Sequence, residues 1–437
     1  MASQPAFYQG INDQAYSLET QVNMPEIVIV GMQGFSQHQK PLLDHFGDRI
    51  IVESDYRPEV ILAHQPDLVI SFEASNCQRG LCIAEAARRQ IATLQVMDGI
   101  TEWRNTWTRR ELPFQRPLNQ PVLAHKVACL GQADARLFES WGNVGKCEVV
   151  GHPRLDPLIN LRRKISLEPI QGRPLRLLVM TARTPGFNKN EVEITYQSLL
   201  DLRDYLSQRE DVQVVWRVTK GLHKRLGVEN TYTEASGKEL HELLGQMDAL
   251  VTTPSTAMLE GMLFRMPVAL LDYHNCPLYV HAAWRISSEE HIAAVLEDLR
   301  CPPLERMLYQ DHCLHDALAC RTAAMPRMVR LIEEMIRIKK MHGSRDSGEL
   351  IFPHRILDEP QDFVSWPSDS FNLEALYPNH PVFGQRDLLL LQAELDSALG
   401  AIEQVKEQVA ILENRLHKIP GYVLATMLVN SLQKHFT

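Results

Sequence analysis

The stretch from Val251 to Tyr273 combines residue types that could bind a nucleotide with the spacing of a strand, a helix and a second strand. It reads VTTPSTAMLEGMLFRMPVALLDY, so an apolar run ends in Thr-Thr-Pro-Ser-Thr, and a glutamate follows the serine by five positions. Ser255 suits a helix N-cap, and the free backbone N–H groups beyond an N-cap attract phosphate. The Glu260 carboxylate, one turn further along, could accept both hydroxyls of a ribose. The stretch is therefore a candidate nucleotide site.

Strand-length apolar runs alternating with helix-length segments must position this motif. Near-continuous apolar strands of this kind are typical of parallel sheets whose two faces are both covered by helices. A first doubly wound domain is predicted for residues 25–165, after a flexible N-terminal segment of residues 1–24. Its predicted strands are PEIVIVG, DRIIVES, PDLVISFE, IATLQVM, HKVACLG and KCEVVGHP.

The same pattern restarts after a basic, proline-bearing link near residues 161–174, which predicts a second Rossmann-like domain over residues 166–341. Its strands are LRLLVMTA, DVQVVWRV, ALVTT and PVALLDY, and long helices are expected between Glu289 and Lys340. Two such domains in tandem bring the carboxyl ends of both sheets to one cleft, where ligands bind. The motif that begins at Val251 is the fourth unit of this second domain.

The remaining chain differs in character. Residues 342–383, rich in Pro, Ser and Asp, are expected to link or wrap the domains, and residues 384–437 to be helical. From Leu388 to Ile419 every a and d position of a heptad is apolar, which predicts a coiled coil that forms a homo-oligomer. One amphipathic helix lying on the second domain is the alternative. The segment after Pro420 is amphipathic and suits a partner or peripheral contact with a membrane.

Composition narrows the function classes. The chain has 437 residues, 45% of them hydrophobic and 23% charged, as expected for two globular domains with extensions. A formal charge of -9 argues against a nucleic-acid partner. Eight scattered cysteines without a Cys-x-x-Cys pair favour reduced thiols in the cytosol. Without a secretory signal or a membrane-length apolar run, we expect a cytoplasmic protein. It could also make peripheral contact with the inner face of the cell membrane.

Two strings resemble a known family. GKELHELLGQMDALVTTPSTAMLEGMLFRMPVALLDY is similar to the donor-nucleotide motif of GT-B fold glycosyltransferases. The similarity is greatest to the branch that holds bacterial surface-polysaccharide transferases, teichoic acid glycerophosphotransferases and non-hydrolysing sugar-nucleotide 2-epimerases. VVGHPRLD, from Val149 to Asp156, resembles the G-N-P-R-x-D hinge of that branch. The resemblance implies an α/β fold of two Rossmann-like domains.

The same resemblance implies the activity and the donor site. The expected enzyme moves a sugar from a nucleotide-diphosphate sugar to a glycan or lipid-linked acceptor in surface polysaccharide synthesis. Glu260 matches the ribose-binding glutamate of the family, and Ser255 and Thr256 match its phosphate-binding helix start. Cations beside the diphosphate are expected among Arg217, Lys220, Arg183 and Lys189, although Arg217 could instead be a surface cation at a strand end.

Stereochemistry and metal use follow from further features of the sequence. Retaining members carry a second glutamate eight positions before the ribose-binding one, where this chain has Thr252, so inversion is expected. No Asp-x-Asp sequence is present, and a helix terminus with cations stabilises a leaving diphosphate without metal, so no metal cofactor is expected. His312, Cys313 and His315 have ligand-like spacing but are also ordinary helix-surface residues.

The general base should come from a first-domain loop at the cleft. VMDGITEWRNTW follows the fourth strand and is dense in polar and aromatic residues. We expect Asp98 to be the base, with Trp103 and Arg104 shaping the acceptor site. His38 and Glu73 are rivals, and each could equally be a solvated loop residue. A sugar-nucleotide epimerase or hydrolase, or a catalytically silent scaffold, remains as an alternative function.

Overall fold

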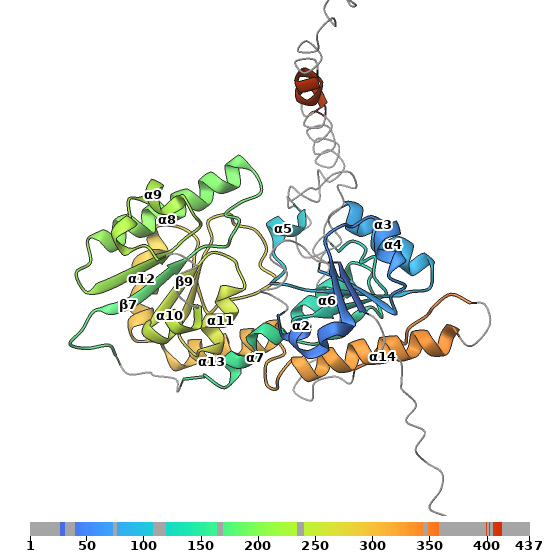
Figure 1. Ribbon diagram of the computed structural model, residues 1–437. Coiled ribbons are helices and arrows are strands. Elements are labelled where there is room, and N and C mark those ends of the chain that lie inside the picture. Colours follow the sequence, from blue (N-terminus) through green and yellow to red (C-terminus); the bar gives the residue numbers. More distant parts are fainter. Residues whose placement is uncertain are drawn as a thin grey trace, which may run out of the picture.

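The computed structural model describes residues 27–30, 40–72, 77–107, 119–163, 169–233, 240–343 and 348–357, with residues 399, 402 and 405–412. They form two α/β units, each built around a parallel sheet (Figure 1). The predicted N-terminal segment, residues 358–383 and most of the predicted C-terminal helix lie outside the described residues.

The first sheet has six parallel strands in the order β2-β1-β3-β4-β5-β6, and they coincide with the six predicted apolar runs. Parallel neighbours need crossover connections, which the helices of this domain supply. The strands are β1 (Ile27–Val30), β2 (Ile50–Glu53), β3 (Leu68–Ser71), β4 (Ala92–Val96), β5 (Lys126–Cys129) and β6 (Cys147–Val149). The helices are α2 (Lys40–Phe46), η1 (Gly47–Arg49), α3 (Pro58–Ala63), α4 (Cys77–Arg88), α5 (Trp103–Trp107) and α6 (Gln132–Ser140).

The second sheet has five parallel strands in the order β11-β10-β9-β7-β8, of which β11 was not predicted. Its strands are β7 (Leu175–Met180), β8 (Val212–Arg217), β9 (Ala249–Thr252), β10 (Val268–Leu271) and β11 (Trp284–Ile286). Before it come η2 (Pro153–Leu155) and α7 (Asp156–Ile159). Its helices are α8 (Lys189–Ser207), α9 (Leu222–Leu226), η3 (Glu229–Thr231), α10 (Leu240–Gln246), α11 (Ala257–Leu263), α12 (Glu290–Arg300) and α13 (Leu304–Ala317).

Alternate side chains of β7 explain why its sequence is apolar throughout. Leu175, Leu177 and Val179 belong to one buried cluster, whereas Leu178 and Met180 belong to another. Successive side chains of a strand point to opposite faces, so both faces of the second sheet are covered. The two-sided burial that the sequence predicted is confirmed for this strand.

Helix α14 (Met325–Gly343) corrects the predicted domain boundary. The sequence assigned all residues up to 341 to the second domain, but α14 contacts β3, β4 and α2 of the first. Met328, Leu331 and Ile332 are fully buried there. Figure 1 shows α14 beneath the first sheet. Periodicity revealed an amphipathic helix, but it contains no information about which of two apolar sheet faces the helix covers.

The chain after α14 continues along the first domain. Ile356 and Leu357 donate their backbone N–H groups to the Glu148 carboxylate at 2.8 and 3.0 Å. Lys126 Nζ donates to Glu148 at 2.7 Å and to the His354 carbonyl at 3.0 Å. Lys126 and Glu148 are both buried, and their hydrogen bonds to the backbone of residues 348–357 attach that segment to β5 and β6.

Residues 405–412 are helical, and the apolar side chains of Val405, Val409 and Leu412 are exposed in the single chain. The coiled coil from Leu388 to Ile419 therefore stays a prediction. Within the described part of the chain, no helix is both long enough and apolar enough to cross a membrane.

Candidate functional site between the two domains

Aromatic residues hold the two domains together beside the predicted site. Trp107 on α5 donates its Nε1–H to the Tyr279 hydroxyl at 2.7 Å, and Trp103 lies 6.2 Å from the Tyr279 ring between centroids. All three side chains are buried, so the expected acceptor residue Trp103 is part of the interdomain packing. A tryptophan N–H that is buried needs such a partner. These contacts fix the distance between α5 and the loop after β10.

The predicted strand, helix and strand of the nucleotide motif are β9, α11 and β10. Glu260 lies on α11 and is 5% exposed. Its Oε1 accepts a hydrogen bond from Arg154 Nη2 at 3.1 Å. Arg154 belongs to η2 and lies in the hinge string VVGHPRLD, in which no role was predicted for the arginine. The structure thus joins the two recognised strings through one ion pair.

The start of α11 differs from the prediction. Ser255 was expected to cap the helix, but Thr256 precedes its first residue with helical dihedrals and makes no side-chain cap hydrogen bond. The Ser255 hydroxyl instead pairs with Thr252 Oγ1 at 3.1 Å. Thr256 Oγ1 accepts the backbone N–H of Ile100 at 3.2 Å, which links the first domain to the start of α11. A Cβ on Gly99 would lie 2.5 Å from that Oγ1, so any larger residue would force the Thr256 side chain to move.

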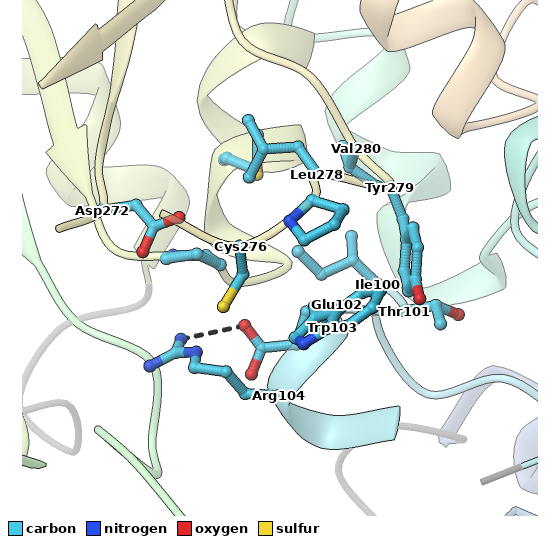
Figure 2. Close-up of a pocket in the computed structure, with 13 residues that line it drawn as sticks. Ile100, Thr101, Glu102, Trp103, Arg104, Asp272, Cys276, Leu278, Tyr279 and Val280 are labelled. Atoms are coloured by element: carbon cyan, nitrogen blue, oxygen red, sulfur yellow. Dashed lines mark hydrogen bonds and ion pairs between the residues drawn. The ribbon is translucent and has the colours of Figure 1, made fainter. Parts of the chain in front are cut away.

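A narrow pocket with about 340 Å³ of open space lies between α5 and the loop after β10. The Glu102 carboxylate enters it from the first domain and pairs with Arg104 Nη2 at 3.0 Å (Figure 2). Asp272 and Cys276 line it from the second domain. Burial raises the pKa of Glu102 and outweighs the opposing effect of Arg104. A carboxyl with a raised pKa beside a fixed cation is a candidate for proton transfer.

Arg104, predicted as an acceptor residue, is buried and reaches across the domain interface. Its Nη1 donates to the Pro185 carbonyl at 3.1 Å and to His274 Nε2 at 3.0 Å. Since arginine only donates, Nε2 of His274 is the acceptor and the ring proton lies on Nδ1. Burial, followed by the charge of Arg104, lowers the pKa of His274. The imidazole is therefore neutral near pH 7.

Asp98, the expected base, has an exposed side chain and is not among the residues that line this pocket. Its backbone carbonyl accepts a hydrogen bond from His152 Nε2 at 3.2 Å. His152 is buried in the hinge, with Nδ1 accepting from the Arg154 N–H at 3.4 Å. The loop position that enters the pocket is Glu102. In the sequence, Glu102 was marked only by the high content of polar residues in its loop, and that content does not indicate which side chain points into the pocket.

The expected phosphate contacts follow strands of the second sheet at its carboxyl edge. Arg217 ends β8 and is half-buried, and Lys220 follows it with an exposed side chain. Arg183, after β7, and Lys189, which begins α8, are exposed. These four cations share one edge of the sheet with Glu260, although none lines the described pocket.

His38 and Glu73 lie outside the described residues. Among the residues that the structure does describe, no three His, Cys, Asp or Glu side chains are grouped to hold a metal ion. Four residues at the site had no predicted role. Arg154 pairs with Glu260, Glu102 and Asp272 line the pocket, and His274 accepts from Arg104.

Comparisons with known proteins give the fold of this arrangement. No family model matches the sequence, and no curated protein matches it. MnaA of S. aureus, solved with UDP, has a TM-score of 0.52 at 13% identity, covering 72% of this chain and 97% of MnaA. A Listeria monocytogenes protein assigned as a UDP-N-acetylglucosamine 2-epimerase has a TM-score of 0.48 at 15% identity. The match covers 74% of this chain and 98% of the Listeria chain.

The wall teichoic acid polymerase TagF gives a TM-score of 0.47 at 12% identity, over 74% of this chain and 90% of TagF. The matched structures thus include sugar-nucleotide 2-epimerases and a teichoic acid polymerase, the branches that the sequence resembled. This arrangement of two Rossmann-like domains is the GT-B fold.

Proposed function

We propose that the protein is a glycosyltransferase that takes a sugar from a nucleotide-diphosphate sugar bound between α11 and the first domain. The observation that supports this most is the Glu260 carboxylate, buried at the carboxyl edge of the second sheet and turned toward the hinge arginine Arg154. A carboxylate can accept both hydroxyls of a ribose. The binding of UDP by MnaA, which shares the fold, supports a uridine nucleotide as the first donor to test.

The diphosphate would lie at the turn before α11. Ser255 and Thr256 begin that turn, and backbone N–H groups at a helix start favour phosphate oxygens. Arg217 and Lys220 would neutralise the leaving group from the end of β8. Arg183 and Lys189 would do so from the loop after β7. Stabilisation by these groups supplies what a metal otherwise would.

Glu102 is our candidate for the general base, in place of the exposed Asp98. In an inverting transfer the acceptor hydroxyl gives its proton to Glu102 while its oxygen bonds to the anomeric carbon. The bond from that carbon to the diphosphate breaks, and the nucleoside diphosphate leaves with the electron pair. Arg104 keeps the Glu102 side chain in the pocket. Thr252, buried where retaining relatives carry glutamate, supports inversion.

The acceptor would enter beside the loop after β10. A wider pocket with about 950 Å³ of open space adjoins the one that Glu102 enters, and Cys276 and Leu278 line both. A glycan or lipid-linked acceptor in surface polysaccharide synthesis suits this space. Oligomerisation through residues 388–419 and contact of the C-terminal segment with a membrane would place several such sites near a lipid-linked acceptor.

Nucleotide binding tests the proposal. Thermal shift and titration calorimetry with UDP, CDP, GDP and ADP should show stabilisation by one of them. Glu260→Gln should weaken that binding at least tenfold, whereas Glu242→Gln, an exposed glutamate on α10, should leave it unchanged. Absence of a shift with every nucleotide would refute the proposed donor site.

A sugar-nucleotide 2-epimerase is the second candidate, because the structures with this fold include such enzymes. The two activities differ in one respect that is easily measured. A transferase releases the nucleoside diphosphate only when an acceptor is added. An epimerase converts the free sugar nucleotide without any acceptor, and its product is visible by NMR.

A further inference from the structure

A basic pocket lies at the other edge of the second sheet. Because the strands of this sheet are parallel, their amino ends share one edge, opposite the edge of Glu260. At this amino edge a pocket with about 580 Å³ of open space is lined by residues that precede β7, β9 and β10, and by the end of α12. Its charged lining residues are Arg163, Arg173, Asp248, Arg265 and Arg300.

Several of these guanidinium groups are held in place by the protein. Arg163 donates to the carbonyls of Leu244 and Met247 at 2.7 and 2.9 Å, at the end of α10. Arg300 donates to the backbone carbonyl of Asp211 at 3.0 Å, and it also pairs with the carboxylate of that residue. Groups fixed in this way lose little conformational entropy when a ligand binds.

Positive charge exceeds negative charge at this edge. Arg176 pairs with Asp248 at 2.7 Å, and Arg173 binds the same carboxylate. Burial would raise the pKa of Asp248, but hydrogen bonds from Arg176 and Arg173 hold it well below the usual range. The single negative charge of Asp248 is thus shared between two arginines. Burial, and next the charge of Arg176, lower the pKa of Arg163, as expected where cations crowd together.

Arg265 lines the same pocket and is partly buried. Its Nε is buried, and no acceptor within the described part of the chain reaches it. The charge of Arg265 contributes only a small part to the lowered pKa of Asp311, whose main cause is the hydrogen bond with His315. The charge of Arg265 lines the pocket together with those of Arg163, Arg173 and Arg300.

We infer that this pocket binds the phosphoryl group of an anionic ligand, at a site separate from the donor site. Planar guanidinium groups bind phosphate oxygens through paired N–H donors. A carboxylate carries a single charge, whereas a phosphate monoester approaches two charges near pH 7 and a diphosphate carries more, which matches the excess of arginines better. The ligand is therefore a free phosphorylated metabolite or a phospholipid whose headgroup ends in a phosphate monoester.

Two variants remove charge from the pocket with little effect on folding. Arg265 has φ +57°, a conformation in which glycine is unstrained, so Arg265→Gly deletes the guanidinium without a backbone penalty. Arg173→Gln leaves Asp248 paired with Arg176. Arg88→Gln, on the first domain and 71% exposed, is the matched control for the change in charge. Circular dichroism and melting temperature verify that all three fold.

Calorimetry of the full chain with inorganic diphosphate is the first arm of the test. We expect binding that weakens at least tenfold in Arg265→Gly and in Arg173→Gln and is unchanged in Arg88→Gln. The second arm is co-sedimentation with vesicles of phosphatidic acid and phosphatidylcholine. Sedimentation lost in the same two variants, without diphosphate binding, would support the site and identify a lipid headgroup as its source.

The inference is overturned if neither diphosphate nor vesicles bind, or if both pocket variants bind them like the wild type. The result does not depend on the proposed activity. Glu260→Gln lies at the opposite edge of the sheet and should leave diphosphate binding at this pocket intact. A diphosphate signal sensitive to Arg217→Gln and not to Arg265→Gly would place the anion at the donor site and would also overturn the inference.

Discussion

Arg154 of the hinge donates a hydrogen bond to Glu260 of α11 at 3.1 Å, and the two residues are separated by 106 positions in the sequence. The Glu260 side chain is 7% exposed and that of Arg154 is 28% exposed. The ion pair therefore holds the carboxylate that is proposed to bind ribose, in the place where a nucleotide would meet the hinge.

Arg154→Met should destabilise the fold, because it leaves the buried Glu260 carboxylate without its cation. We expect the free energy of unfolding to fall by about 1–3 kcal/mol, measured by urea denaturation. Arg154→Met combined with Glu260→Gln should lose less than the sum of the two single changes. Strict additivity would contradict a direct interaction.

Gly99→Ala should push the first domain away from α11, because the new Cβ would lie 2.5 Å from Thr256 Oγ1. We expect a lower melting temperature and weaker nucleotide binding. Thr256→Ala removes that oxygen and leaves the next nearest atom at 3.9 Å, so the double variant should recover most of the loss. Failure of the second change to rescue the first would show that the clash is not the cause.

Glu102→Gln should lower kcat by about 10²- to 10⁴-fold if Glu102 is the general base. The raised pKa of Glu102 means that the carboxylate form appears only above the usual range for glutamate. Activity should therefore rise with pH through that pKa, and the dependence should vanish in the variant. Glu193→Gln, 63% exposed on α8, is the control. Loss of activity in Asp98→Asn, with Glu102→Gln still active, would restore Asp98 as the base.

Asp134 should make stability depend on pH. Burial raises its pKa to about 7, against the hydrogen bonds from Thr101 and the Leu130 N–H. The folded state then holds this proton between pH 4 and 7 while the unfolded state has lost it. Stability contributed by this group should decrease as pH rises across that window, by about 4 kcal/mol at most.

Urea denaturation at pH 5.0 and 7.5 checks this dependence. Asp134→Asn cannot ionise, so its stability should change less between the two values than that of the wild type. Asp44→Asn, on an exposed side chain of α2, should behave like the wild type. Equal pH dependence in Asp134→Asn and the wild type would contradict the assignment.

The C-terminal heptads should set the oligomeric state. Val405 and Val409 occupy d and a positions and are exposed in the single chain. Changing both to aspartate should convert the protein to a monomer in light scattering, because buried charges oppose helix pairing. Lys406→Ala, between them, should not. An unchanged mass in the double variant would favour the alternative of one helix lying on the second domain.

Local sequence determined both sheets and the place of the nucleotide motif. Apolar runs marked ten of the eleven strands in the described part of the chain, since a strand buried on both faces has a continuous apolar sequence whatever its neighbours are. Only β11, three residues long, was missed. The same local reasoning placed Glu260 on a helix after β9, because strand end, turn and helix start are adjacent in the chain.

Tertiary structure decided what these residues face. Arg154 with Glu260, and Arg104 with His274, are contacts between segments more than a hundred positions apart, which no periodicity encodes. The choice of Glu102 over Asp98 depends on the direction in which one loop turns. In the same way the apolar face of α14 predicted burial but not its partner, which is the first sheet. The sequence by itself determined where most strands and helices lie along the chain, and the packing of the two domains against each other decided which side chains share a pocket.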